Sequence, residues 1–151
     1  LISKLFKNKF IKKIFLINDK KKIFKNLTKY KYQRLKVIEK EFKKLNNRNI
    51  VLFCAGRIAR VAINIFDSFD ANIINIFDNN PRLSNQKVSN IKITHPLILK
   101  KKLKKYSSIN VIICEYNRKK IENIKSQLNV LGIDSKKILQ FDGFYLTKYV
   151  K

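Results

Sequence analysis

The chain has little of the chemistry that metal sites and disulfide frameworks require. It contains only two cysteines and one histidine among 151 residues. Cys54 and Cys114 both lie inside apolar runs, which is typical of reduced core thiols rather than of a disulfide or a metal site. A zinc site cannot be assembled around His95 as the sole imidazole. We therefore expect no metal site and a reducing, cytoplasmic environment.

Long hydrophobic runs are also missing. No segment approaches the roughly 18 uncharged apolar residues that span a bilayer. The early apolar stretch at residues 14–17 is closely flanked by lysines and is followed by no small-residue cleavage site, so a secretory signal is not expected. Met and Trp are absent and the first residue is Leu1, which suggests a truncated or misassigned start.

Acidic residues are few. The chain has 35 Lys and Arg against 10 Asp and Glu, a formal net charge of +25. Residues 1–48 carry 17 basic and 3 acidic side chains, and residues 49–151 carry 18 and 7. Such a charge favours association with polyanions, either nucleic acid or an anionic membrane. Abundant Lys, Asn, Ile and Phe are equally typical of an AT-rich coding sequence, so both interpretations remain open.

Residues 1–48 contain no Gly or Pro and are predicted to form a basic helical N-terminal segment. We expect a first helix up to a break at Asn18 and Asp19, and a second helix that runs to about Leu45. Amphipathic helices rich in Lys and Arg either contact anionic membranes peripherally or pack on a neighbouring domain with their lysines in water. Residues 49–151 are predicted to form a separate nucleotide-binding domain.

The periodicity changes at residue 49. The continuous apolar run at residues 50–54 is typical of a buried parallel strand, further strands are expected at 72–77 and 109–114, and shorter ones at 91–93 and 137–141. Helical patterns fall at 57–69, from Pro96 into the lysine cluster at 100–105, and at 118–131. Residues 82–90 are predicted to be a polar loop. This alternation predicts an α/β fold: a Rossmann-like, doubly wound, mostly parallel sheet preceded by the basic helical segment.

The turn after the first strand carries the principal motif. A dinucleotide-binding turn has the pattern G-x-G-x-x-G or A, and here Cys54, Gly56 and Ala59 occupy the three small positions. Gly56 allows the backbone to approach a phosphate, and the following helix points its N-terminus at an anion. Asp78 ends the second strand, 22 residues after Gly56, where a carboxylate accepts hydrogen bonds from ribose hydroxyls. The alternative is that Gly56 only makes a turn and Asp78 only caps a loop.

Five segments of this chain carry a family resemblance. Residues 51–56, 77–81 and 93–97, together with residues 111–114 and 119–133, resemble the Rossmann-like modules of bacterial surface-polysaccharide enzymes. Such modules occur in sugar-nucleotide acetyltransferases, in nucleotide-sugar dehydratases and in the C-terminal part of sugar C-methyltransferases. The resemblance covers residues 49–141. It implies a nucleotide or nucleotide-sugar binding module associated with glycan or surface-polysaccharide synthesis, with NAD(P) or a nucleotide sugar as ligand.

The predicted binding residues follow from the motif and the resemblance together. Gly56 and the amides after it would hold phosphate, with the Arg57 guanidinium as a further phosphate partner. Asp78 would hold the ribose, while Asn79 and Glu115 would form the pocket rim. Ala55 and Ile58 complete the predicted cofactor-binding set; no catalytic residue is assigned.

The sequence departs from the family pattern in two respects. Glycine is usual where this chain has Cys54, which would alter pyrophosphate contact at the turn. The acetyltransferase β-helix and the methyltransferase core are both missing from these 151 residues. A second hypothesis is therefore that the chain is a C-terminal fragment of a sugar C-methyltransferase type of enzyme.

Other candidates leave alternatives open. His95 is either an acid–base group near the sheet edge or, more in keeping with its lack of an acidic or nucleophilic partner by spacing, a helix-capping residue. Glu115, Tyr116 and Asn117 either contact a base, sugar or acyl group or form an ordinary strand-to-helix loop. A third hypothesis is a basic nucleic-acid-binding protein, although the chain has no recognised binding motif and its aromatic residues mostly lie inside apolar runs, so no specific nucleic acid is expected.

Overall fold

The computed structural model describes residues 29–45, 47–99, 101 and 108–143. The predicted first helix, its break at Asn18 and Asp19, and the proposed membrane contact of the N-terminal segment lie almost entirely outside the described residues. Most of the lysine cluster at residues 100–105 also lies outside them. No helix in the described part of the chain is long and apolar enough to cross a membrane.

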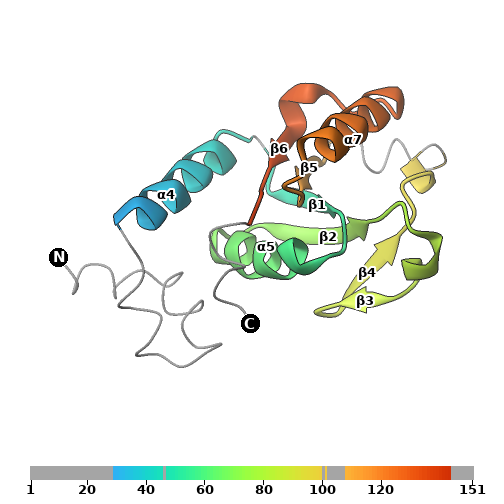
Figure 1. Ribbon diagram of the computed structural model, residues 1–151, viewed down its shortest axis with the longest axis horizontal. Helices are drawn as coiled ribbons and strands as arrows, with labels where there is room; N and C mark the ends of the chain where they lie inside the picture. Colours follow the sequence, from blue (N-terminus) through green and yellow to red (C-terminus); the bar gives the residue numbers. More distant parts are fainter. Residues whose placement is uncertain (1–28, 46, 100, 102–107, 144–151) are drawn as a thin grey trace.

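Six strands form one sheet in the order β3-β4-β2-β1-β5-β6 (Figure 1). Five strands are parallel: β1 (Asn49–Phe53), β2 (Asn72–Phe77), β4 (Ile91–Thr94), β5 (Asn110–Ile113) and β6 (Ile138–Gln140). The short β3 (Lys87–Val88) runs antiparallel to β4 at one edge. This is the predicted Rossmann-like, mostly parallel α/β fold.

The central strands are mostly apolar because both faces of the sheet are covered, and the buried polar residues among them are Asn75 and Asn110. Helix α5 (Arg57–Ser68) lies on one face and α7 (Arg118–Val130) on the opposite face (Figure 1). Alternate residues of β1 divide between the two layers: Leu52 packs in the core beneath α5, while Val51 and Phe53 pack in the core beneath α7. Right-handed crossovers explain this division. The chain moves from β1 to β2 in one direction across the sheet and from β5 to β6 in the other, so the helices of these two connections lie on opposite faces.

The end of the basic N-terminal segment packs onto the domain. Helix α4 (Lys29–Lys43) places Phe42 in the core beneath α5, where its side chain is only 3% exposed. The Phe42 ring lies 5.4 Å from the Phe66 ring in an edge-to-face contact and 6.0 Å from the ring of Phe69. An aromatic contact of this kind buries a large apolar area, so this end of α4 is part of the same hydrophobic core.

The predicted loop at residues 82–90 was wrong in part. It contains a short 3-10 helix, η1 (Pro81–Leu83), and the edge strand β3, which forms a hairpin with β4. The two hairpin loop residues, Ser89 and Asn90, have φ values of 49° and 67°, as a type I′ turn requires. Sequence patterns that identify such turns rely on Gly, which is absent here, so the hairpin gave no clear signal.

Candidate functional site

The strand order reverses between β1 and β5. From β1 the chain continues outward through β2 to β4, and the later strands β5 and β6 lie on the other side of β1. In open α/β sheets, ligands bind in the crevice outside the carboxyl ends of the strands at such a switch point. Gly56 follows β1, Asp78 follows β2 and Glu115 follows β5, so the fold brings the three predicted groups to the same edge.

The N-terminus of α5 opens on this edge. Gly56 is its N-cap residue, with φ −76° and ψ −164°, and no side chain makes a capping hydrogen bond there. A Cβ atom built on Gly56 would meet nothing within 4 Å among the described residues. Packing and backbone strain therefore do not require glycine at this position in the unliganded protein. A ligand that approached the backbone closely at the N-terminus of α5 would be a separate reason for a residue without a side chain at position 56.

The N-terminus of α7 differs in this respect. The Asn117 side-chain oxygen accepts a hydrogen bond from the Lys120 N–H at 3.1 Å. The Glu115 carboxylate accepts hydrogen bonds from the N–H groups of Tyr116 and Asn117 at 2.9 and 3.0 Å. Two side chains therefore satisfy the backbone donors at the start of α7, whereas the start of α5 has no side-chain cap.

Glu115 is held firmly in its loop. Its side chain is 13% exposed, and its second carboxylate oxygen lies 3.7 Å from the Lys120 ammonium group. Its contacts resemble those of an ordinary strand-to-helix loop, one of the two readings of residues 115–117. Lys120 itself had not been predicted as part of the site; as an exposed lysine in a helix rich in Lys, it carried no distinguishing signal.

Cys54 occupies the first glycine position of the motif and adopts the backbone conformation of a glycine, with φ +75°. It lies just beyond the end of β1 and is partly exposed, so the prediction of a buried strand residue was only approximately right. Burial, together with the nearby carboxylates of Asp78 and Glu115, raises the pKa of the Cys54 thiol from 9.0 to about 12, and the Lys120 ammonium group opposes this rise. The thiol is therefore neutral near pH 7 and is a poor nucleophile.

Cys114 is the neighbouring thiol, immediately after β5. Both cysteines are free, and Cys114 packs in the core on the α5 side of the sheet while Cys54 packs against the core on the α7 side. Complete burial raises the pKa of Cys114 well above 9.0. The fold thus gives both thiols an apolar setting that suppresses their ionisation.

Asp78 joins the turn after β1 to the turn after β2. One carboxylate oxygen accepts a hydrogen bond from the Ala55 N–H at 2.8 Å, and the other accepts from the Asn80 N–H at 2.8 Å. The carboxylate is partly buried, so these charge-assisted bonds fix the path of the backbone leading into Gly56. Each oxygen retains capacity for a second donor, because a carboxylate has about four lone-pair sites.

Asn79, a predicted rim residue, makes a reciprocal amide pair with Gln127 of α7. The two N–H···O hydrogen bonds are both 2.9 Å long. The pair connects the loop after β2 to a helix 48 residues later in the sequence. Nothing in the sequence identified Gln127 as a partner, since a contact over that separation depends on the fold.

The other predicted binding residues have different environments. The side chains of Ala55 and Ile58 are buried, whereas Arg57 is exposed at the start of α5. Gly143, with φ +57°, passes over Ile58: a Cβ on this glycine would lie 2.8 Å from the Ile58 Cγ2 atom. Ile58 can therefore contribute only its backbone to a ligand, as the assignment of amides to phosphate requires.

His95 follows β4 and serves as a cap. Its Nδ1 atom accepts a hydrogen bond from the Leu97 N–H at 3.3 Å, and its carbonyl accepts from the Ile98 N–H. Of the two interpretations of His95, the geometry fits helix capping. The preceding residue, Thr94, belongs to β4, and its hydroxyl pairs with the buried Asn75 amide because parallel pairing with β2 extends through Thr94.

Comparison with known proteins identifies the fold but no family. No protein-family profile matches the chain, and no curated protein matches it in sequence. Among solved structures, it is similar to the UDP-D-quinovosamine 4-dehydrogenase of Vibrio fischeri, with a TM-score of 0.52 and 16% identity over 68% of this chain and 86% of the other.

The chain is also similar to a repressor of the Rex family. The complex of that repressor with β-NADH gives a TM-score of 0.51 and 17% identity over 78% of this chain and 66% of the repressor. Its complex with β-NAD+ and operator DNA gives a TM-score of 0.50 and 16% identity over 79% and 61% of the two chains. At these identities the likeness establishes one conclusion, namely that residues of this chain adopt the Rossmann-like α/β fold.

Proposed function

We propose that the protein binds a nucleotide-type ligand, a dinucleotide or a nucleotide sugar, at the switch point between β1 and β5. The observation that carries the proposal is the uncapped N-terminus of α5, which begins at a glycine with open space where a side chain would project. Backbone N–H groups and the helix dipole at such a terminus favour a phosphate. The amides of Gly56, Arg57 and Ile58 would hold it, with the Arg57 guanidinium beside them.

Asp78 would orient the sugar next to that phosphate. Its carboxylate is already fixed by two backbone N–H groups, so it needs no rearrangement to accept further hydrogen bonds from ribose hydroxyls. Glu115 and Asn79 would line the rim through the positions of their loops. Both side chains are already hydrogen-bonded, and they would shape the entrance as parts of rigid loops.

We place this binding module in glycan or surface-polysaccharide synthesis. Two observations support that assignment: the resemblance of residues 49–141 to modules of such enzymes, and the structural likeness to a dehydrogenase that acts on a UDP-sugar. The alternative hypothesis is that the chain is a C-terminal fragment of a sugar C-methyltransferase type of enzyme. An in-frame catalytic domain encoded upstream of Leu1 would support it, and an unrelated upstream gene would contradict it.

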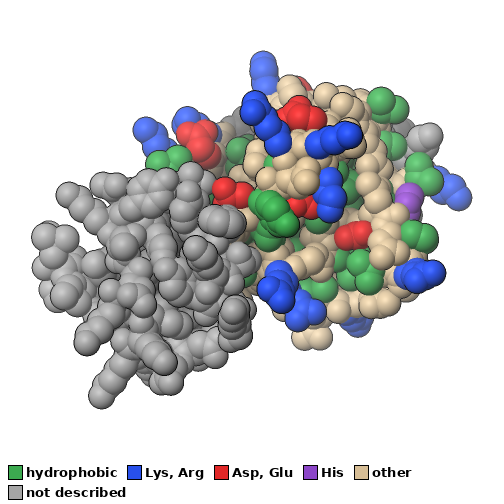
Figure 2. Space-filling view, in the orientation of Figure 1, with side chains coloured by type: hydrophobic (Ala, Val, Ile, Leu, Met, Phe, Trp, Pro, Cys, Tyr) green, Lys and Arg blue, Asp and Glu red, His purple; other side chains and the backbone are tan. Residues whose placement is uncertain are grey.

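The net charge of +25 favours polyanions in general, but it does not define a specific nucleic-acid site. Figure 2 shows Lys and Arg side chains distributed over several parts of the visible face, with acidic side chains between them. A gel shift in rising salt tests this directly. We expect nonspecific nucleic-acid affinity to disappear by about 200 mM salt, while binding of a small nucleotide at the switch point persists.

Isothermal titration tests the proposed function. The folded protein would be titrated with NAD+, NADH, UDP-N-acetylglucosamine and ADP-ribose. We expect at least one of them to bind with submillimolar affinity. Absence of binding to all four at millimolar concentration, by protein with an intact thermal transition, would contradict the proposal.

A pair of glycine substitutions separates binding from folding. Gly56→Ala adds a methyl group into open space at a negative φ, so we expect its unfolding free energy to remain within about 1 kcal/mol of the parent value. The same methyl group would obstruct an approaching phosphate, and affinity should fall at least tenfold. The matched control, Gly143→Ala, meets Ile58 at a positive φ and should lose about 2 kcal/mol or more of stability. Unchanged affinity in Gly56→Ala would place the phosphate elsewhere.

A further inference from the structure

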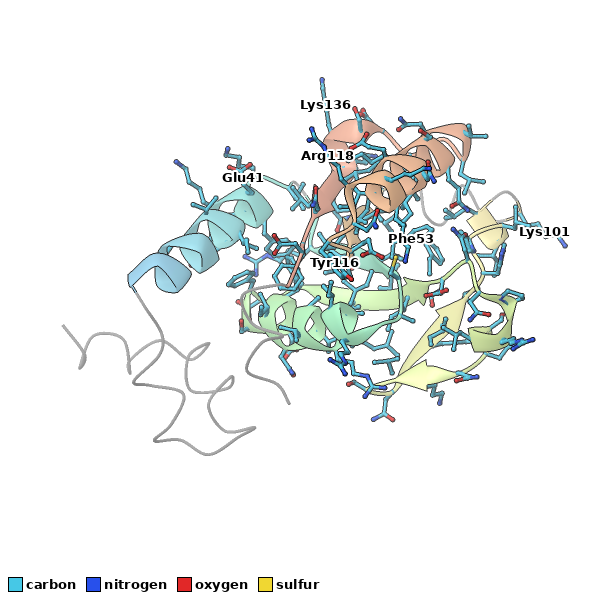
Figure 3. The ribbon with its side chains drawn as sticks, viewed as in Figure 1. Glu41, Phe53, Lys101, Tyr116, Arg118 and Lys136 are labelled. Atoms are coloured by element: carbon cyan, nitrogen blue, oxygen red, sulfur yellow. The ribbon has the colours of Figure 1, made fainter. Side chains whose placement is uncertain are left out.

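Tyr116 is a large aromatic side chain left exposed at the edge of the switch point. It follows β5 by three residues, and 68% of its surface is exposed. Figure 3 shows it in the space between α7 and α5. It therefore lies at the carboxyl edge of the sheet, where both α5 and α7 begin.

The backbone beneath Tyr116 is rigidly held. The Glu115 carboxylate accepts hydrogen bonds from the Tyr116 and Asn117 N–H groups, and Asn117 in turn caps α7. The exposure of Tyr116 thus does not arise from a loose loop. An aromatic ring on a fixed backbone has few rotatable bonds, so little conformational entropy is lost when a flat group stacks on it.

The position of Tyr116 relative to Asp78 defines what would lie on it. Asp78 follows β2 and Tyr116 follows β5, with β1 between them, and neighbouring strands are about 4.8 Å apart, so the two strand ends are separated by about 10 Å. Consider a ligand whose first ribose lies at Asp78 and whose diphosphate lies at the N-terminus of α5. The group attached to its second phosphate would then lie at the end of β5. That group is the one Tyr116 can contact.

We propose that Tyr116 is a specificity-determining residue that stacks on a flat aromatic ring at the distal end of a dinucleotide of the nicotinamide class. This inference rests on the proposed function, since it requires the phosphate at α5 and the ribose at Asp78. It goes further by choosing a dinucleotide over a nucleotide sugar as the ligand. Stacking of a ring on an aromatic side chain typically contributes a tenfold or larger gain in affinity.

The test compares NAD+ with ADP-ribose, which lacks the nicotinamide ring. Titrations would use the full chain and Tyr116→Ala, with Tyr116→Phe as the variant that keeps the ring and Val130→Ala as a control at another exposed apolar position, where the side chain is 83% exposed. We expect Tyr116→Ala to weaken NAD+ about tenfold and ADP-ribose less than twofold. Tyr116→Phe and Val130→Ala should bind both ligands as the parent does.

Other outcomes overturn the inference. An equal loss for NAD+ and ADP-ribose in Tyr116→Ala would show that the residue supports the loop rather than the distal ring. A loss confined to UDP-N-acetylglucosamine would place a sugar at Tyr116, and unchanged affinities would remove Tyr116 from the site. If the parent protein binds neither NAD+ nor ADP-ribose, the dinucleotide assignment fails; failure with UDP-N-acetylglucosamine as well would also remove the proposed function.

Discussion

At the scale of single residues, the turn after β1 combines a strained cysteine with an unstrained glycine. Cys54 has φ +75°, a conformation that costs an L-residue with a side chain roughly 1–2 kcal/mol relative to glycine. Gly56 has a negative φ that other residues adopt without strain. Backbone conformation alone would therefore favour glycine at position 54 and would not require it at position 56. Cys54 is held by its N–H bond to the Phe77 carbonyl at 2.8 Å and by burial of its thiol.

The Cys54 thiol should make stability depend on pH in the alkaline range. In the unfolded chain the thiol loses its proton near pH 9.0, whereas in the folded protein its pKa is about 12. Above pH 9 the unfolded state therefore binds fewer protons, and the free energy of unfolding falls as pH rises. The contribution of the neutral thiol is fully present below pH 9 and is lost progressively toward pH 12.

Urea unfolding at pH 8, 9.5 and 10.5 measures this effect when the parent is compared with Cys54→Gly. Lysine and tyrosine titrations are common to both proteins and cancel in the difference. We expect the parent to lose stability more steeply than the variant above pH 9. Parallel pH profiles would show that the folded thiol ionises as readily as the unfolded one. At pH 7 the variant should differ by less than about 1 kcal/mol, because relief of the positive φ offsets the greater flexibility of glycine in the unfolded chain.

Asp78 has a structural role that can be separated from ligand binding. Asp78→Asn presents one acceptor oxygen to the two N–H groups of Ala55 and Asn80, so one donor loses its side-chain acceptor and the other keeps only an uncharged one. We expect a loss of about 1.5–3 kcal/mol in unfolding free energy, measured by urea denaturation. Asp70→Asn makes the same change in charge at an exposed pair with Arg48 and should alter stability by less than about 1 kcal/mol. Equal effects in the two variants would mean that Asp78 stabilises only through its charge.

At the scale of secondary-structure elements, the two helices that begin at the switch point, α5 and α7, have different N-termini. The start of α7 is satisfied by Asn117 and Glu115, and the start of α5 has no side-chain cap. Both helices carry basic rather than acidic residues in the first turn, which opposes the helix dipole. For α7 the side-chain caps offset this unfavourable arrangement. For α5 a bound phosphate would do so.

Removal of the α7 cap tests this account. Asn117→Ala leaves the Lys120 N–H without its side-chain acceptor, and we expect a loss of about 1 kcal/mol, measured by thermal or urea unfolding. Asn117→Asp keeps an acceptor and adds a favourable charge at the helix N-terminus, so it should be as stable as the parent or more so. A neutral result for Asn117→Ala would show that the two Glu115 hydrogen bonds suffice to define the start of α7.

Elements with strong periodicity were predicted well, and those defined by single turns were not. The runs at residues 50–54, 72–77 and 109–114 became the central parallel strands with boundaries shifted by a residue or two. The Ser89–Asn90 hairpin was missed because neither residue is the glycine that usually marks a type I′ turn. In the site, the positions of Gly56, Asp78 and Glu115 at strand ends were predictable, whereas the partners of Asp78, Asn79 and Glu115 were not.

At the scale of the whole molecule, α4 is joined to the Rossmann-like layer by an aromatic cluster. Phe42, Phe66 and Phe69 contact one another, and Phe66 also contacts Phe141 from the C-terminal side of β6. Residues from both ends of the described chain thereby meet on the α5 face of the sheet. This packing favours the second of the two interpretations of the basic segment, a helix that covers a neighbouring domain, for the part that is described.

Phe42→Ala should therefore destabilise the whole domain. The ring is 3% exposed, so its removal leaves a cavity, and we expect a loss of about 3–5 kcal/mol with a single unfolding transition. Val37→Ala is a matched control on the same helix, where the side chain is 59% exposed, and should have little effect. If Phe42→Ala reduced helical circular dichroism without lowering the melting temperature of the domain, α4 would be an independent appendage.

The sequence by itself determined the alternation of buried strands and amphipathic helices, and with it the Rossmann-like fold and the sheet edge at which we propose that a ligand binds. It did so because periodicity and continuous apolar runs are local properties of the chain. Only the tertiary structure decided that Asp78 clamps the Gly56 turn, that Asn79 pairs with Gln127 and that the start of α5 lacks a cap. The two hydrogen-bonded contacts join residues that are 23 and 48 positions apart in the sequence, and the packing of the sheet and its helices decides whether such residues come together.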